Sequence, residues 1–181
     1  MKKIVMSFAI LMALLFFVSC GQHSQQQAAP VLSDSIAELS ESVDAELAPD
    51  FELPDLQGNP LKLSSLRGKY VVLDFWGSWC IWCIRGIPHM KEAYSKYKEM
   101  MEILGIDCND SEEDWRSAVS EHQLPWLQVR CPEDQMESVA NAYHIEGFPT
   151  KVVIDPKGKI VKVVVGEDPA FYTYLDDLFA K

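Results

Sequence analysis

The chain has 181 residues, of which 27 are acidic and 16 basic, so its formal net charge at pH 7 is −11. A surface this acidic argues against binding nucleic acid or docking on anionic lipid, because both present negative charge. The length allows one domain once the terminal segments are set aside, and the sequence contains no internal repeat.

The first 19 residues have the pattern of an export signal. Lys2 and Lys3 precede an apolar run over residues 4–18, and small residues surround a cleavage point. Because Cys20 follows, the segment resembles a bacterial lipoprotein signal, which is cleaved before the cysteine and leaves its thiol lipidated. We therefore expect residues 1–19 to be removed and the protein to be anchored through Cys20 in the cell envelope, facing the periplasm. An uncleaved anchor and plain secretion are the alternatives, although about 15 residues are few for a spanning helix.

Residues 20–48 are rich in Gln, Ser, Ala and Glu, so we expect a flexible tether there. Apolar residues at rough helical spacing, from Ile36 to Leu47, also allow a short amphipathic helix. The remaining residues, 49–181, form the single predicted domain.

This domain alternates strands and helices. Two short alternating segments around residues 57–59 predict a β-hairpin, and residues 64–69 a turn or short helix. The later elements expected are a strand at 70–76, a helix at 80–101 kinked at Pro88, a strand at 102–107, a helix at 111–122, a strand at 126–130, a helix at 133–143, strands at 151–155 and 159–165, and a helix from 168 onward. This order predicts an α/β fold whose mixed sheet has a parallel core.

Cys80 and Cys83 form a Cys-x-x-Cys directly after the strand at 70–76. We expect Cys80 to lie exposed at the start of a helix, where backbone N–H groups and the helix dipole stabilise a thiolate nucleophile. Cys83, one turn later, would resolve a mixed disulfide. Zinc ribbons and haem attachment sites use the same spacing, but Ile84 stands where haem attachment requires a histidine.

Asp74 is the one charged residue within this apolar strand. Burial disfavours the ionised carboxyl and so raises its pKa, which suits Asp74 to accept the proton of Cys83. A buried acid that only makes structural hydrogen bonds is the alternative.

Two further cysteines, Cys108 and Cys131, follow the strands at 102–107 and 126–130. Beyond an export signal, an even number of cysteines indicates an oxidising compartment. If these strands are parallel neighbours, both thiols lie at the same sheet edge, about 5 Å apart, a separation compatible with a disulfide. We predict a structural Cys108–Cys131 bond; two free buried thiols or a second redox relay are the alternatives.

The segment from Asp74 to Cys83 resembles the active-site segment of thioredoxins, and Pro88 falls where their helix kinks. Gly147-Phe148-Pro149-Thr150 matches their cis-proline loop. The hairpin before the first long strand and the long stretch before Pro149 resemble the TlpA-like, membrane-tethered thioredoxins of the bacterial envelope. The resemblance implies a thioredoxin fold with an N-terminal β-hairpin and an inserted helix plus strand before the cis-proline loop.

The same resemblance implies substrate-binding roles around Cys80. The Phe148–Pro149 bond should be cis, and the Phe148 backbone should pair with an extended substrate peptide. Trp79 should lie at the rim of the site, while Trp76 packs in the core. An ordinary trans proline before a strand is the alternative for Pro149.

The function implied is that of a thiol–disulfide oxidoreductase that reduces protein disulfides in the envelope. It would act as a monomer without a cofactor or metal, and a membrane electron donor such as a DsbD-like reductase would re-reduce it. Two positions depart from the relatives. Ile81-Trp82 replaces a dipeptide with proline before the second cysteine, and Gly86 stands where relatives in cytochrome c maturation commonly carry glutamate.

Three other functions compete with this interpretation. The same dithiol would serve a disulfide oxidase or isomerase, because the direction depends on the redox potential. A peroxiredoxin-type peroxidase would need Thr or Ser and Pro where Gly77 and Leu73 stand. Finally, Cys80 and Cys83 could bind copper or zinc, with Cys108 and Cys131 completing a four-thiolate zinc site, but Asp74 and Pro149 would then have no role.

Overall fold

The computed structural model describes residues 47–180. The export signal, the lipidation site Cys20 and nearly all of the predicted tether lie outside these residues. The described elements are β1 (Glu52–Pro54), β2 (Pro60–Lys62), a 3-10 turn (Leu63–Leu66), β3 (Tyr70–Trp76), α1 (Ile81–Tyr97), β4 (Met101–Cys108), α2 (Glu112–Glu121), β5 (Leu127–Cys131), α3 (Glu133–Ala142), β6 (Thr150–Ile154), β7 (Ile160–Val165) and α4 (Pro169–Phe179). None of these helices is long and apolar enough to cross a membrane.

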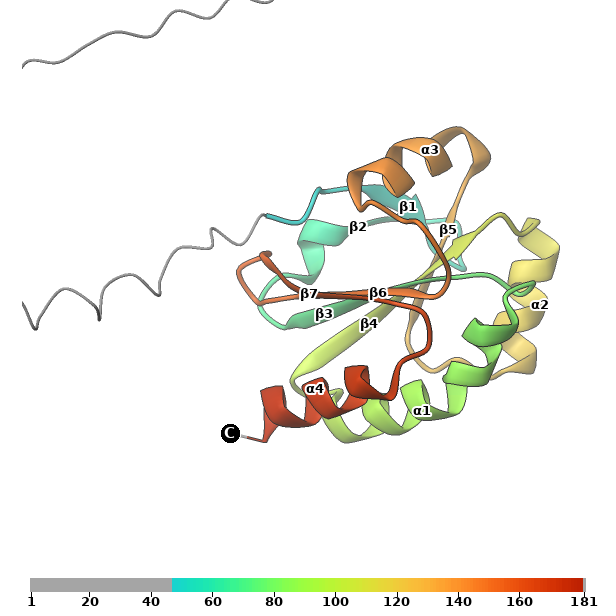
Figure 1. Cartoon of the computed structure of the whole chain (residues 1–181). Coiled ribbons are helices and arrows are strands. Elements are labelled where there is room, and N and C mark those ends of the chain that lie inside the picture. The colour runs from blue at the N-terminus through green and yellow to red at the C-terminus, as the bar shows by residue number, and fades with distance from the viewer. Residues whose placement is uncertain (1–46, 181) are drawn as a thin grey trace, which may run out of the picture. The chain divides into compact units, whose positions relative to one another are not determined.

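The main sheet has five strands in the order β5-β4-β3-β6-β7. The strands β3, β4 and β5 are parallel, whereas β6 and β7 run antiparallel to their neighbours. The hairpin β1–β2 and α3 lie on one side of this sheet, and α1 and α4 lie side by side on the other (Figure 1). The predicted thioredoxin fold, with its N-terminal hairpin and the insert formed by α2 and β5, is confirmed.

Alternate residues of β3 face the two layers. Leu73 and Phe75 pack in the cluster under the hairpin and α3. Val72 packs with Met90 of α1 on the opposite side of the sheet, where α4 adds its apolar face. Both faces of β3 are therefore buried, which explains its nearly continuous apolar sequence.

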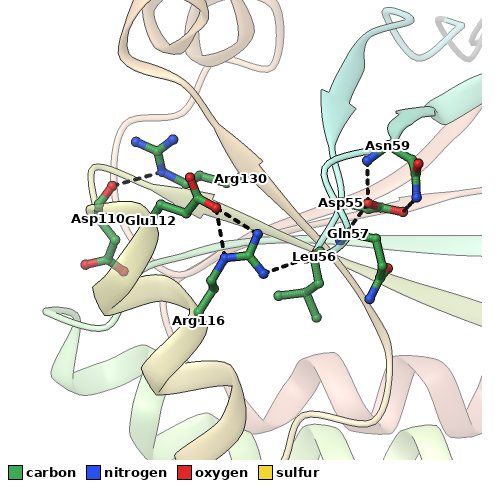
Figure 2. Close-up of polar contacts among 8 residues, drawn as sticks. All are labelled: Asp55, Leu56, Gln57, Asn59, Asp110, Glu112, Arg116 and Arg130. Carbon is green, nitrogen blue, oxygen red and sulfur yellow. Dashed lines mark hydrogen bonds and ion pairs between the residues drawn. The ribbon is translucent and has the colours of Figure 1, made fainter.

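The hairpin is fixed to the inserted helix by polar contacts (Figure 2). The Asp55 carboxylate accepts hydrogen bonds from the backbone N–H groups of Gln57 and Asn59 and so closes the β1–β2 turn. Arg116 of α2 donates to the Leu56 carbonyl and pairs with Glu112 one turn earlier. The hairpin turn and α2 therefore support each other.

Helix α1 ends earlier than its sequence predicts. The predicted helix runs to residue 101, whereas α1 ends at Tyr97 and Met101 already pairs with Tyr70 as the first residue of β4. The side chain of Met101 is fully buried. Pairing and burial of Met101 in the sheet outweigh the helical preference of the residues before it, so the chain turns at 98–100.

Candidate active site

A disulfide between Cys80 and Cys83 lies at the junction of β3 and α1. Cys80 is the N-cap of α1, and its Sγ accepts a hydrogen bond of 3.1 Å from the backbone N–H of Cys83. The predicted position of the first cysteine at a helix start is confirmed. The N–H group that meets the sulfur there can also stabilise a thiolate.

The prediction that Cys80 is exposed is wrong for this disulfide-bonded form. Its side chain is only 5% exposed, nearly the same as that of Cys83 at 6%. The reason is that both sulfurs pack in a cluster with Trp76 and Trp115 of α2. The exposed side chains of this turn are instead Trp79, Ile81 and Trp82.

Asp74 is buried beneath α1. It shares one face of β3 with Val72, which packs against Met90, and with Trp76, which packs against Cys83. Asp74 therefore lies under the part of α1 between Cys83 and Met90. Its Oδ1 atom has no hydrogen-bond partner in the described part of the chain. Burial raises the pKa of this carboxyl, a Lys151 charge opposes the rise and a Glu167 charge adds to it.

The Phe148–Pro149 peptide bond is cis, as the resemblance implied. The Phe148 ring meets the Trp79 ring edge to face at 5.2 Å, and Phe148 also packs against the cluster that contains both sulfurs. Trp79 is 52% exposed, so it forms part of the rim, as predicted. The cis-proline loop and the disulfide turn thus border one surface.

The end of β4 and the loop after it hold the turn that precedes the disulfide. Asp110 accepts hydrogen bonds of 2.7 Å from both the backbone N–H and the hydroxyl of Ser78, and the Cys108 carbonyl accepts the indole N–H of Trp79 at 2.9 Å. Arg130 of β5 in turn donates to the Asp110 carbonyl (Figure 2). This role of Asp110 was not predicted from the sequence; the cap of α2 is the next residue, Ser111.

Cys108 and Cys131 lie directly opposite each other on the parallel strands β4 and β5. The disulfide predicted between them is not formed in the structure, where both thiols are free and buried. The Cys108 thiol lies 3.5 Å from the Ile106 carbonyl, and the Cys131 thiol 3.9 Å from the Pro132 carbonyl. Burial raises the pKa of both thiols, to about 11 for Cys131. A raised pKa keeps these thiols protonated and unreactive at neutral pH.

The four cysteines do not form one metal site. Cys80 and Cys83 pack near α2, whereas Cys108 and Cys131 belong to the cluster under α3, on the other side of the sheet. Within residues 47–180, no three His, Cys, Asp or Glu side chains gather where they could hold a metal ion. The four-thiolate zinc arrangement considered from the sequence is therefore not present.

A buried ion pair next to Asp74 was not predicted from the sequence. The Lys151 Nζ atom lies 2.8 Å from Glu167 Oε2, and the Tyr172 hydroxyl donates to Glu167 Oε1 at 2.6 Å. The signal that could have revealed it is the same as for Asp74, a lone charge inside an apolar strand. Glu167 and Tyr172 also line a cavity of about 430 Å³ between α1 and α4 that reaches Trp82.

A thioredoxin fold with a cysteine disulfide at the start of α1, bordered by a cis-proline loop, defines a thiol–disulfide oxidoreductase. The comparisons with known proteins agree. The family model described as "AhpC/TSA family" matches residues 43–163. The chain belongs to this family, and within it to the TlpA-like thiol–disulfide oxidoreductases of the thioredoxin superfamily.

Relatives and a solved structure show the extent of the likeness. Thiol-disulfide oxidoreductase ResA of Bacillus cereus is 36% identical over 66% of this chain and 68% of its own length. ResA of Geobacillus kaustophilus is 31% identical over 91% of this chain and 88% of its own. The crystal structure of the thioredoxin domain of a Bacteroides vulgatus thiol-disulfide oxidoreductase is 33% identical with a TM-score of 0.70, and the match covers 74% of this chain and 96% of that one.

Proposed function

We propose that this protein reduces disulfide bonds of other proteins in the bacterial cell envelope through the Cys80–Cys83 couple. The observation that carries the proposal is the disulfide at the start of α1, with Asp74 beneath the same helix and the cis-proline loop at its rim. The structure contains the oxidised form, which is the product of one reduction cycle.

The cycle transfers two electrons to the substrate. The Cys80 thiolate attacks one sulfur of a substrate disulfide, so a mixed disulfide forms and one substrate thiolate leaves. Cys83 then gives its proton to Asp74 and attacks the Cys80 sulfur, which closes the Cys80–Cys83 disulfide and releases the second substrate thiolate. The substrate gains two electrons, the enzyme dithiol loses two, and the proton on Asp74 returns to the leaving thiolate or to solvent.

Substrate binding falls to the rim of the site. We propose that the Phe148 backbone pairs with an extended stretch of the substrate, because the cis-proline after it has no N–H to offer and leaves the neighbouring backbone groups to the partner chain. Trp79, which is half exposed and packs on Phe148, would contact side chains next to the substrate cysteine. A Trp79→Ala variant should therefore raise KM more than it lowers kcat.

The pattern of the first 20 residues supports a location in the cell envelope and, with it, an electron source in the membrane. A lipid on Cys20 would hold the monomeric domain at the membrane, facing the periplasm, with residues 20–48 as a tether. A membrane reductase of the DsbD-like kind would then supply electrons to the Cys80–Cys83 disulfide. The oxidising compartment makes such a donor necessary, because no cytosolic thiol pool reaches the protein there.

Reduction of insulin in the presence of dithiothreitol tests the activity. The wild-type domain should accelerate the precipitation of insulin chains, and Cys80→Ser should reduce the rate to that of dithiothreitol alone. Cys108→Ser is the matched control and should retain activity. An unchanged rate in Cys80→Ser would refute the proposal. A Cys83→Ala variant should then trap substrates as mixed disulfides and so identify them.

A further inference from the structure

The Lys151–Glu167 ion pair lies beside Asp74 on the side of the sheet that α1 and α4 cover. Lys151 is the cross-strand partner of Asp74 in the antiparallel β3–β6 register, so the two side chains are neighbours on one face. The side chains of Lys151 and Glu167 are only 2% and 13% exposed. Tyr172 of α4 completes the group through its hydrogen bond to Glu167.

Stability alone does not explain such a pair. Removing two charges from water costs several kcal/mol, and apolar replacements of buried pairs are often as stable or more stable. Lys151 also lies among apolar groups, with its Nζ atom 5.6 Å from the centre of the Phe171 ring. A charged pair kept in this place, next to a candidate proton acceptor, indicates a role in the reaction.

Gly86 lies where the Lys151–Glu167 pair meets α1, the helix that carries the disulfide. A Cβ atom at Gly86 would lie 2.3 Å from Glu167 Oε2, closer than any real contact. Gly86 follows Cys83 by three residues, so the two share a face of α1. The absence of a side chain at this position therefore lets the Glu167 carboxylate contact α1 one turn after Cys83.

We propose that Lys151, Glu167 and Tyr172 form a positioning network for Asp74, which sets the pH range over which Asp74 exchanges a proton with Cys83. The inference rests on the proposed role of Asp74 as the proton acceptor. Lys151 stabilises the Asp74 carboxylate, Glu167 destabilises it, and Tyr172 holds Glu167 in place.

The two charges of the pair act on Asp74 in opposite directions, although they form one ion pair. On β4, the register neighbour of Asp74 is Gly105, which carries no charge. The titratable and charged groups that the neighbouring elements bring toward Asp74 are Lys151 from β6, Glu167 from the loop before α4, Tyr172 from α4, Cys83 from α1 and, through the sheet, Cys108 from β4.

Because the charges of Lys151 and Glu167 act on Asp74 in opposite directions, the sign of the Asp74 pKa shift in each variant tests the proposal. Carbon-detected NMR titration of the Asp74 carboxyl in the oxidised protein should show a higher pKa in Lys151→Met and a lower pKa in Glu167→Gln. Each shift should be about half a pH unit or more, which is about a threefold change in proton affinity. The double variant should show a smaller rise than Lys151→Met. The acid limb of the pH profile of insulin reduction should move with each shift.

The exposed Lys96–Asp176 pair between α1 and α4 provides the matched controls. Lys96→Met and Asp176→Asn break an ion pair of similar length and should leave the Asp74 pKa unchanged. A merely structural role of the buried pair predicts no shift, or shifts of equal sign in both single variants, and either result overturns the inference. If Lys151→Met does not fold, Glu167→Gln still has to lower the pKa.

The outcomes also separate this inference from the proposed function. If wild-type protein showed no Cys80-dependent activity, the proposed function itself would be refuted. NMR shifts of the expected signs without a matching displacement of the pH profile would refute the transfer of a proton from Cys83 to Asp74, and the inference with it, while the dithiol activity would stand.

Discussion

Two carboxyl groups, Asp74 in β3 and Asp107 in β4, lie inside the sheet. Burial raises the pKa of both, and the neighbouring Asp110 adds to the rise for Asp107, whose pKa reaches about 9. Asp107 therefore prefers its protonated form near neutral pH. Asp74 lies beneath the part of α1 that begins with Cys83. We therefore expect the raised pKa of Asp74 to matter for the proposed reaction and that of Asp107 to affect stability.

Replacing Asp74 with asparagine tests its role as the proton acceptor. Asp74→Asn keeps the size of the side chain but removes the proton acceptor, so the step in which Cys83 closes the disulfide should slow by about 10²-fold. Stopped-flow reduction of a model disulfide by the reduced protein, followed by tryptophan fluorescence, measures this rate. Asp177→Asn on the exposed face of α4 is the control. Equal rates for Asp74→Asn and wild type would show that Asp74 has only a structural role.

The second prediction concerns Asp107 and stability. Its folded pKa of about 9 exceeds the ordinary value of 3.8, so its stabilising contribution is complete below pH 4 and is lost as the pH rises toward 9. Within this window the loss is at most about 1.4 kcal/mol per pH unit. Asp107→Asn lacks this titration. Its Tm, relative to wild type, should therefore rise between pH 5 and pH 8 in thermal melts; a constant difference would contradict the account.

At the scale of elements, the contact of α1 with the loop before α4 depends on Gly86. Alanine in a helix is favoured over glycine by about 1 kcal/mol, so Gly86→Ala would stabilise α1 if nothing opposed it. The Glu167 carboxylate occupies the space of the new methyl group. We therefore predict that Gly86→Ala lowers the Tm and displaces Glu167 from Lys151. Ser95→Ala on the exposed face of α1 should raise the Tm slightly, and a rise of similar size in Gly86→Ala would contradict the contact.

Most elements and the redox pair could be predicted from local patterns. The apolar run at 70–76, the cysteine spacing and the Phe148-Pro149 motif each carry their signal within a few residues, and all three are confirmed. The end of α1 could not be predicted, because the pairing of Met101 with Tyr70 decides it across the sheet. Local sequence contains no information on such a contact.

The predicted site was incomplete for the same reason. Asp110 accepts a hydrogen bond from Ser78, and Asp74 lies beside Lys151, which pairs with Glu167. These contacts join segments that are far apart in the sequence. The burial of Cys80 depends on Trp115 of the inserted helix, which the pattern around the cysteines does not reveal. By contrast, the strand order predicted that Cys108 and Cys131 lie at one sheet edge, although the bond expected between them is absent.

At the scale of the whole molecule, we predict that a lipid on Cys20 keeps the domain at the membrane. Cys20→Ala should prevent lipidation while leaving the redox domain folded. Metabolic labelling with a radioactive fatty acid should mark the wild-type protein but not the variant. Detergent-free fractionation should move the variant out of the membrane pellet unless the uncleaved apolar segment holds it. Labelling of both proteins, or of neither, would contradict the assignment of Cys20.

We propose that the Cys80–Cys83 couple donates electrons to protein disulfides. The most direct test is its reduction potential, measured by equilibrating the purified domain with defined ratios of reduced and oxidised dithiothreitol or glutathione and trapping free thiols at each ratio. Cys108→Ser/Cys131→Ser protein isolates the signal of the active pair. We predict a reducing value near that of thioredoxin, about −270 mV, whereas a value near −120 mV would make the protein an oxidant and contradict the proposed direction.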